Sequence, residues 1–151
     1  MSNSLYYEDF ETGQIFKSPA RTITEADLTI FSMVSGDWNP IHVDAEYAKT
    51  TRFGQRLVHG ALGIAIITGF YDRIGVFEDS ALALLGIQDW QFKAPILIGD
   101  TLHMEMEIGE KRLTSKGDAG IMDRIIRLKR HDGTVVQEGR MGIMLKLKPK
   151  S

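Results

Sequence analysis

The spacing of apolar residues changes character once along this chain, and that change limits the folds available to it. As far as about Gly75 the apolar residues follow a helical or irregular spacing, whereas beyond Ala81 they mostly alternate as in β-strands. The helical part ends with residues 60–75, where apolar side chains cover almost the whole circumference. A helix of that kind has to be buried rather than laid on a surface.

The second half of the chain predicts a run of long antiparallel strands. Residues 81–92 form a nearly continuous apolar run, residues 101–108 alternate between apolar and polar, and 119–130 and 134–148 are expected to be further strands. Asp132-Gly133 is typical of a two-residue hairpin turn. An antiparallel sheet has one face to cover, and wrapping it around the apolar helix buries both elements. We therefore predict an α+β fold in which a curved antiparallel sheet is wrapped around one long central helix.

An earlier helix is expected before residue 36. Thr24 is a candidate N-cap with Asp27 three residues later, and the apolar residues that follow are spaced for one helix face. This spacing predicts an amphipathic helix whose apolar face carries Ile30, Met33 and Val34.

Length, charge and cysteine content exclude several classes of protein. The 151 residues suggest one domain, 1–151, and the net charge of −2 lacks the basic excess of a nucleic-acid-binding protein. The absence of cysteine excludes disulfides, thiolate metal sites and cysteine nucleophiles. The first residues contain no secretory signal pattern, and no apolar run approaches the ~18–20 residues that span a bilayer. We expect a cytoplasmic protein without membrane or nucleic-acid partners.

The densest group of reactive side chains lies between Gly36 and His42. This segment places the Asp37 carboxylate, the Asn39 amide and the His42 imidazole within six residues, and Pro40 predicts a shaped loop rather than more helix. Spacing alone leaves two interpretations open. Either the carboxylate and the imidazole converge on a substrate, or these residues only make local turns and caps.

This segment resembles a known family signature. The MaoC-like (R)-specific enoyl-CoA hydratases, which have a hot-dog fold, carry a motif similar to Gly36-Asp37-Trp38-Asn39-Pro40-Ile41-His42. The similarity extends to Phe31, Val34-Ser35 and Ala48 around the motif, to Val58-His59-Gly60-Ala61, and to Ala94-Pro95 with Gly99-Asp100. It covers nearly the whole chain, and the first motif is the specific one.

The resemblance implies a role for five residues. Asp37 and His42 match the catalytic pair that holds one water, and Gly60 matches the glycine whose N–H binds the thioester carbonyl. Thr68 matches more loosely a serine near the carbonyl and the water, and Asn39 a residue that supports the site loop. The resemblance further implies an acyl-CoA substrate, a homodimer with thioester sites at its interface, and neither a cofactor nor a metal.

The chemistry of hydration makes use of a carboxylate and imidazole pair and a backbone N–H of this kind. Adding water to a trans-2-enoyl thioester needs a base that takes a proton from the water and an acid that protonates Cα. It also needs hydrogen-bond donors aimed at the developing enolate oxygen, which the N-terminus of a helix provides. The expected reaction is therefore the (R)-specific hydration of an enoyl-CoA, or the reverse dehydration.

Two alternatives stay open. Another hot-dog thioester enzyme, a thioesterase or an acyl-carrier dehydratase, usually has an acid near the start of the central helix, and residues 61–70 contain none. A non-catalytic acyl-thioester-binding subunit would have no use for the carboxylate and imidazole pair.

Other histidines and cations in the sequence are expected to have mostly structural roles. His42 and Asp44 lack a third metal ligand at a recognisable spacing, and His59 is expected to support the loop or cap the central helix. The basic cluster in 124–130 is expected to lie on a solvated strand face. Some of its members, or Arg52, Arg56 and Lys93, are candidates for contacts with the CoA phosphates.

Overall fold

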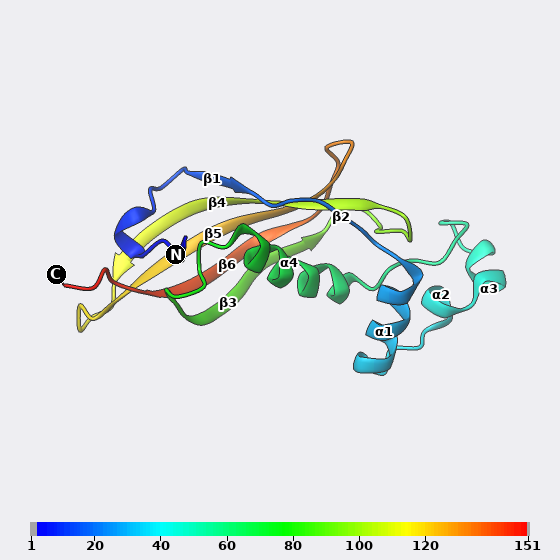
Figure 1. Ribbon diagram of the computed structural model, residues 1–151. Coiled ribbons are helices and arrows are strands. Elements are labelled where there is room, and N and C mark those ends of the chain that lie inside the picture. The colour runs from blue at the N-terminus through cyan, green and yellow to red at the C-terminus, as the bar shows by residue number, and fades with distance from the viewer. Residues whose placement is uncertain (1–2, 151) are drawn as a thin grey trace.

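A computed structural model of the protein, which describes residues 3–150, contains one six-stranded antiparallel sheet (Figure 1). The spatial order is β1-β4-β5-β6-β3, and β2 also pairs with β4. Burial alternates along most of β4, β5 and β6 but not along β3, which is exposed over most of its length. β4 continues five residues beyond its expected end. The bounds are β1 Ile15–Lys17, β2 Arg21–Thr22, β3 Ala81–Phe92, β4 Thr101–Leu113, β5 Ala119–Arg130 and β6 Val135–Lys146.

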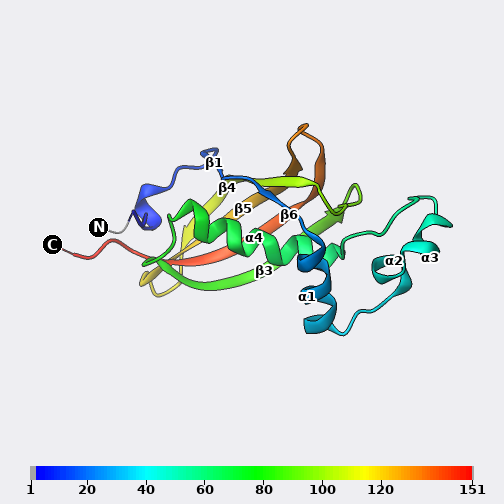
Figure 2. The same ribbon diagram turned by 45° about the vertical axis from the view of Figure 1, so that its right-hand side comes forward.

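The long helix α4, Gly60–Ile74, lies across one face of the curved sheet (Figures 1 and 2). Its buried side chains join the inward-facing residues of β4, β5 and β6 in one hydrophobic core. The predicted α+β fold is therefore confirmed. The helix itself is less enclosed than expected, because Ala61, Ala65, Thr68 and Gly69 are exposed in the single chain. The sheet covers one side of α4 and leaves a face of small residues open.

The helices α1 (Glu25–Ser35), α2 (Pro40–Val43) and α3 (Ala45–Lys49) project beyond one end of the sheet (Figure 2), while the short 3-10 helix η1 (Tyr7–Asp9) lies near its other end. The predicted capping of α1 is confirmed, since Thr24 and Asp27 form a reciprocal capping box.

The predicted apolar face of α1 is wrong. Ile30, Met33 and Val34 are 59%, 67% and 81% exposed, and the buried residues are Leu28 and Ser32. Helix α1 lies beyond the end of the sheet that packs against α4, so few of its side chains reach the core.

The edge strand β3 is apolar and largely uncovered. Leu82, Leu84, Leu85, Ile87 and Phe92 are all exposed on it. Among residues 3–150, β6 is the one strand that pairs with β3. Within residues 3–150, no helix has the length and apolar character needed to cross a membrane.

Candidate active site

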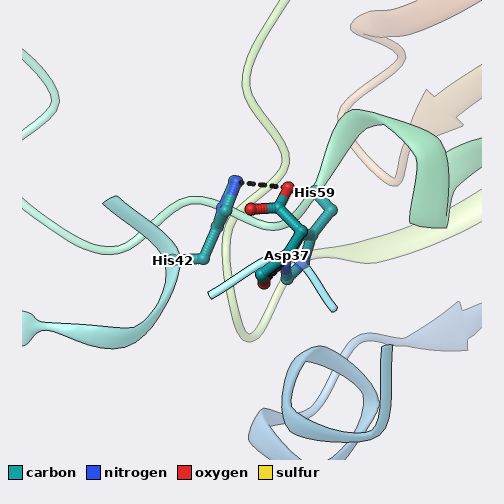
Figure 3. A group of neighbouring side chains, drawn as sticks. All are labelled: Asp37, His42 and His59. Carbon is teal, nitrogen blue, oxygen red and sulfur yellow. Dashed lines mark hydrogen bonds and ion pairs between the residues drawn. The ribbon is translucent and has the colours of Figure 1, made fainter. Parts of the chain in front are cut away.

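The structure brings the Asp37 and His42 side chains together beyond the end of α1 (Figure 3). Gly36 ends that helix with φ at 74°, a value that glycine adopts without strain. The Oδ1 atom of Asp37 then accepts a hydrogen bond from the Asn39 N–H at 3.1 Å. This turn leaves Oδ2 free, and it lies 3.7 Å from Nε2 of His42.

His42 is positioned by a short helix that the sequence analysis did not predict. Asn39 caps α2 by accepting a hydrogen bond from the Ile41 N–H at 3.1 Å, and Pro40 occupies the first turn. Proline is tolerated there because its missing N–H would have no partner inside the helix. The expected non-helical loop is therefore wrong for residues 40–43. Asn39 itself lies between the two side chains in sequence, capping α2 and donating its N–H to Asp37.

The backbone fixes which nitrogen of His42 carries a proton when the ring is neutral. Nδ1 lies 2.7 Å from the Leu57 carbonyl oxygen, which can only accept. Nδ1 is therefore the protonated nitrogen, and Nε2 presents a lone pair toward the Asp37 carboxylate. Two acceptors 3.7 Å apart make no direct hydrogen bond, but a water molecule has two protons to give, one to each.

His59 is the residue whose importance the sequence analysis underestimated. Its side chain is buried and does not cap α4. Its ring stacks on that of His42, with centroids 3.8 Å apart, and its Nε2 lies 3.1 Å from the Asp37 carbonyl and 3.2 Å from Ser32 Oγ. One side chain thus touches the ring of His42 and the backbone of Asp37, as Figure 3 shows.

The donor atoms of Asp37, His42 and His59 all lie within 4.8 Å of one another, so a metal has to be considered. One carboxylate and two imidazoles are a common ligand set for zinc and iron. The two rings, however, are stacked with an interplanar angle of 24°. Their in-plane lone pairs run side by side rather than toward one point, and this geometry does not suit a single ion.

Gly60 lies next in the chain to His59, as the first residue of α4. The N–H groups of a first helical turn have no partner inside the helix, so they are available to a ligand. A Cβ on Gly60 would lie 2.8 Å from Cε1 of Phe92, which shows how closely this backbone is covered. Gly60 lines an open hollow of about 260 Å³ together with Phe53, Phe92 and Pro95, and with the cations Arg52 and Lys93.

Gln137 is a second buried residue that the sequence analysis missed. Its Nε2 donates to the Gly60 carbonyl oxygen at 2.9 Å, and its Oε1 accepts from Trp90 Nε1 at 3.3 Å. It ties the start of α4 to β3 and β6. The sequence did contain a sign of this position. Gln137 precedes Met141 by four residues, so in a strand both side chains point to the same, inward face of β6.

Thr68 is not brought to this site within the single chain. It lies two turns further along α4, where its hydroxyl donates to the Ala65 carbonyl at 2.6 Å. It lines a different hollow, with Leu82, Leu84 and Arg124.

Most of the cations expected to contact CoA already form ion pairs with carboxylates of this chain. Arg56 is paired with Glu25, Lys93 with Glu138 and Arg127 with Glu107. Arg52 stands over the Phe53 ring at 4.8 Å and makes no ion pair within the described part of the chain. Arg124 was expected on a solvated strand face, and this is wrong, because the structure buries it.

Comparison with known proteins agrees with this architecture. The family model described as "MaoC like domain" matches residues 9–126. The (R)-specific enoyl-CoA hydratase of Rhodospirillum rubrum is 40% identical over 97 residues, which are 64% of this chain and 65% of that enzyme, less than two thirds of its length. The unliganded R-hydratase of Pseudomonas aeruginosa superposes with a TM-score of 0.79 at 32% identity, covering 96% of this chain and 88% of that one.

The fold has a further parallel in a Mycobacterium tuberculosis protein with a double hot-dog fold. That structure matches 99% of this chain and 46% of its own with a TM-score of 0.87 at 19% identity, a likeness of fold alone. Together, the family model, the relatives and the helix-on-sheet architecture establish that this chain belongs to the MaoC-like domain family of hot-dog proteins.

Proposed function

We propose that this protein catalyses the (R)-specific hydration of a trans-2-enoyl-CoA to a 3-hydroxyacyl-CoA, or the reverse dehydration. The observation that carries the proposal is the 3.7 Å separation between Asp37 Oδ2 and Nε2 of His42, whose Nδ1 is held by the Leu57 carbonyl. Two proton acceptors at this spacing suit one shared water. Further support comes from the similarity to proteins described as (R)-specific enoyl-CoA hydratase and R-hydratase.

In the proposed reaction the shared water is the nucleophile. Its oxygen bonds to Cβ while one of its protons passes to the pair, and the π electrons of the Cα–Cβ bond move toward the thioester carbonyl to form an enolate. The proton held by the pair is then returned to Cα on the same face, so water adds across the double bond with no net change in the enzyme. Imidazole suits such a relay because it gains and loses protons near neutral pH.

The enolate oxygen needs donors that are already in place. The free N–H of Gly60 at the start of α4 meets this need, and the positive end of the helix dipole favours the same negative charge. The lack of a side chain at Gly60 allows the thioester to approach the backbone closely.

The CoA portion is proposed to approach through the hollow beside Gly60. Arg52 lines that hollow and has no carboxylate partner within residues 3–150, so it is the cation best placed for a phosphate. Lys93 lines it too but is paired with Glu138.

We also propose a homodimer built on β3. The exposed leucines of this edge strand, together with the open small-residue face of α4, form an apolar surface that a second copy would cover. Light scattering of the purified protein is expected to give the mass of two chains or a multiple of two. A monomeric mass at micromolar concentration would contradict this part of the proposal.

The reaction is tested with crotonyl-CoA. Loss of the enoyl-thioester absorbance, followed by chiral analysis of the product, is expected to give the (R)-3-hydroxy thioester. If crotonyl-CoA and a panel of longer, branched and dicarboxylic enoyl-CoAs all go unreacted, the proposed activity is wrong and a binding subunit becomes the better account.

A further inference from the structure

A second hollow, of about 320 Å³, lies between the later part of α4 and the start of β3. It is separate from the hollow beside Gly60. Its walls are mostly apolar, and they include Leu82, Leu84 and Ile143, together with the polar residues Thr68, Tyr71 and Arg124.

Arg124 is a buried cation without a counter-ion. The residue is 1% exposed, and its Nε donates to the Met141 carbonyl at 3.0 Å. Its guanidinium carbon stands 4.3 Å from the centre of the Tyr71 ring and 5.4 Å from that of Phe77. Nη2 is buried and has no hydrogen-bond partner, and no carboxylate of residues 3–150 forms an ion pair with this arginine. The neighbouring acid, Asp123, bonds instead to Arg140 at 2.7 Å.

The hydroxyl of Tyr71 is a second donor beside the guanidinium. Burial raises the pKa of Tyr71 to about 12, so its hydroxyl stays protonated at neutral pH. Its partner is the Met141 sulfur at 3.3 Å, which is a weak acceptor. Arg124 Nη2 therefore has no acceptor, and Tyr71 Oη, on the ring that the guanidinium faces, has only a weak one.

A buried charge of this kind is costly unless an opposite charge joins it. An anion at the Arg124 end of the hollow would remove that cost and would satisfy the free N–H. The apolar walls argue against a free inorganic anion, whose other oxygen atoms would find no donors there. They suit a carboxylate carried on a short methylene chain, because the methylenes pack against the aliphatic side chains while the carboxylate reaches the guanidinium.

The proposed dimer relates this hollow to the chemistry. A two-fold axis that continues the sheet, with both α4 helices on one face, makes adjoining β3 strands antiparallel. The start of one β3, with Leu82 and Leu84, then lies near the end of the other, where Phe92 lines the hollow of Gly60. An acyl group bound at one thioester site would thus extend toward the Arg124 hollow across the interface.

We propose that the Arg124 hollow binds the free carboxylate of a dicarboxylic acyl group, so that this protein prefers trans-2-enedioyl-CoA thioesters to monocarboxylic enoyl-CoAs of equal length. This inference rests on the proposed function, since it names the substrate class of the same site.

Binding of substrate analogues that cannot be hydrated separates the inference from catalysis. Calorimetry would compare adipyl-CoA with hexanoyl-CoA, two saturated thioesters that differ in one terminal carboxylate. A charged hydrogen bond in a buried site predicts that the full-length protein binds adipyl-CoA at least about tenfold more tightly. Equal affinities, or binding of neither thioester, overturn the inference.

Three variants assign that preference to the hollow. Arg124→Met should reduce the affinity ratio to about one or below, and Tyr71→Phe, which keeps the ring, should reduce it severalfold. Arg127→Met is the matched control, because Arg127 lies on the same strand but pairs with Glu107 at 2.9 Å on the other face of the sheet. A preference for adipyl-CoA that survives Arg124→Met overturns the inference. Should that variant not fold, Tyr71→Phe and the wild-type ratio decide it.

The two proposals can fail separately. Hydration of crotonyl-CoA without a preference for adipyl-CoA leaves the proposed function standing and removes this inference. A preference for adipyl-CoA without hydration of any enoyl-CoA supports the hollow and removes the activity.

Discussion

Nε2 of His42 faces Oδ2 of Asp37 across 3.7 Å, with Nδ1 of the same ring bonded to the Leu57 carbonyl. In the neutral ring the hydrogen bond to the backbone leaves Nε2 as an acceptor, so that the two side chains then meet as two bases. This relationship is why we regard one water, rather than a direct hydrogen bond, as the natural occupant between them.

The pair should behave as a single unit in kinetics. His42→Ala is expected to lower kcat by roughly 10²–10⁴, the range of general acid–base catalysis. The double variant Asp37→Ala/His42→Ala should lose little more than His42→Ala alone, because either deletion removes the shared water site. Steady-state rates with crotonyl-CoA measure this. Losses that multiply in the double variant would mean that the two residues act independently.

His59 is expected to position the pair rather than react. His59→Phe keeps a ring against His42 but leaves the Asp37 carbonyl without its buried donor, which costs about 1–3 kcal/mol of unfolding free energy. The displaced site should lower kcat by roughly 10- to 100-fold in the fraction that remains folded. Urea unfolding and single-turnover rates measure the two effects.

Ser32→Ala is the matched control for His59, because it removes the hydroxyl beside Nε2 and leaves the bond to the Asp37 carbonyl. Its effect on kcat should be the smaller one. A His59→Phe variant with wild-type kcat would remove the positioning role.

Gly60 should not tolerate a side chain. In Gly60→Ala the new Cβ would lie 2.8 Å from Phe92, whose exposed ring must move into the hollow that Gly60 lines. We expect kcat/KM for crotonyl-CoA to fall by roughly tenfold or more, because the thioester loses close access to the N–H. Adding Phe92→Ala should restore part of this loss. A single Gly60→Ala variant with unchanged kcat/KM would contradict the assignment of this N–H to the carbonyl.

Acid should weaken the fold through Glu105 on the solvent side of the sheet. Hydrogen bonds from Lys129 and then Lys17 hold the pKa of this carboxyl below its ordinary value of 4.5. Between its folded and unfolded pKa values the unfolded chain binds more protons, so the stabilisation is present above pH 4.5 and disappears as the pH falls through the folded value. Glu105→Gln should therefore cost about 1 kcal/mol at pH 7 and almost nothing at the acid end.

Urea unfolding as a function of pH checks this prediction. Glu46→Gln is its control, since Glu46 makes an exposed ion pair with Lys49 on the same helix and should matter little at any pH. A Glu105→Gln cost that stays constant from pH 7 to pH 3 would show that the effect is not electrostatic.

Local patterns predicted the elements well because each depends on its own neighbours. Alternation and, for β3, a continuous apolar run predicted the four long strands, and Thr24 with Asp27 predicted the start of α1. Pro40 was misjudged because a proline that follows the Asn39 cap starts a helix instead of preventing one. Whether a helix face is covered depends on the packing of whole elements, and for this reason the exposure of Val34 was not predictable.

In the candidate site, too, local features were predictable and contacts between distant segments were not. The motif placed Asp37 and His42 near each other in sequence, but the stacking of His42 on His59 joins segments that only the folded chain brings together. Arg124 was assigned to a solvated face because of its charged neighbours. Its alternation with Met122 and Ile126 on β5 was the signal that it points inward.

Asp37→Asn, measured beside the wild type, decides whether Asp37 and His42 carry out the hydration. The amide oxygen can still accept the Asn39 N–H, so the thermal midpoint should stay within about 2 °C. Turnover of crotonyl-CoA should fall by roughly 10²–10⁴, while Asp72→Asn, an exposed acid at the far end of α4, should leave it unchanged. Wild-type turnover by a folded Asp37→Asn protein would contradict a hydration reaction run by Asp37 and His42.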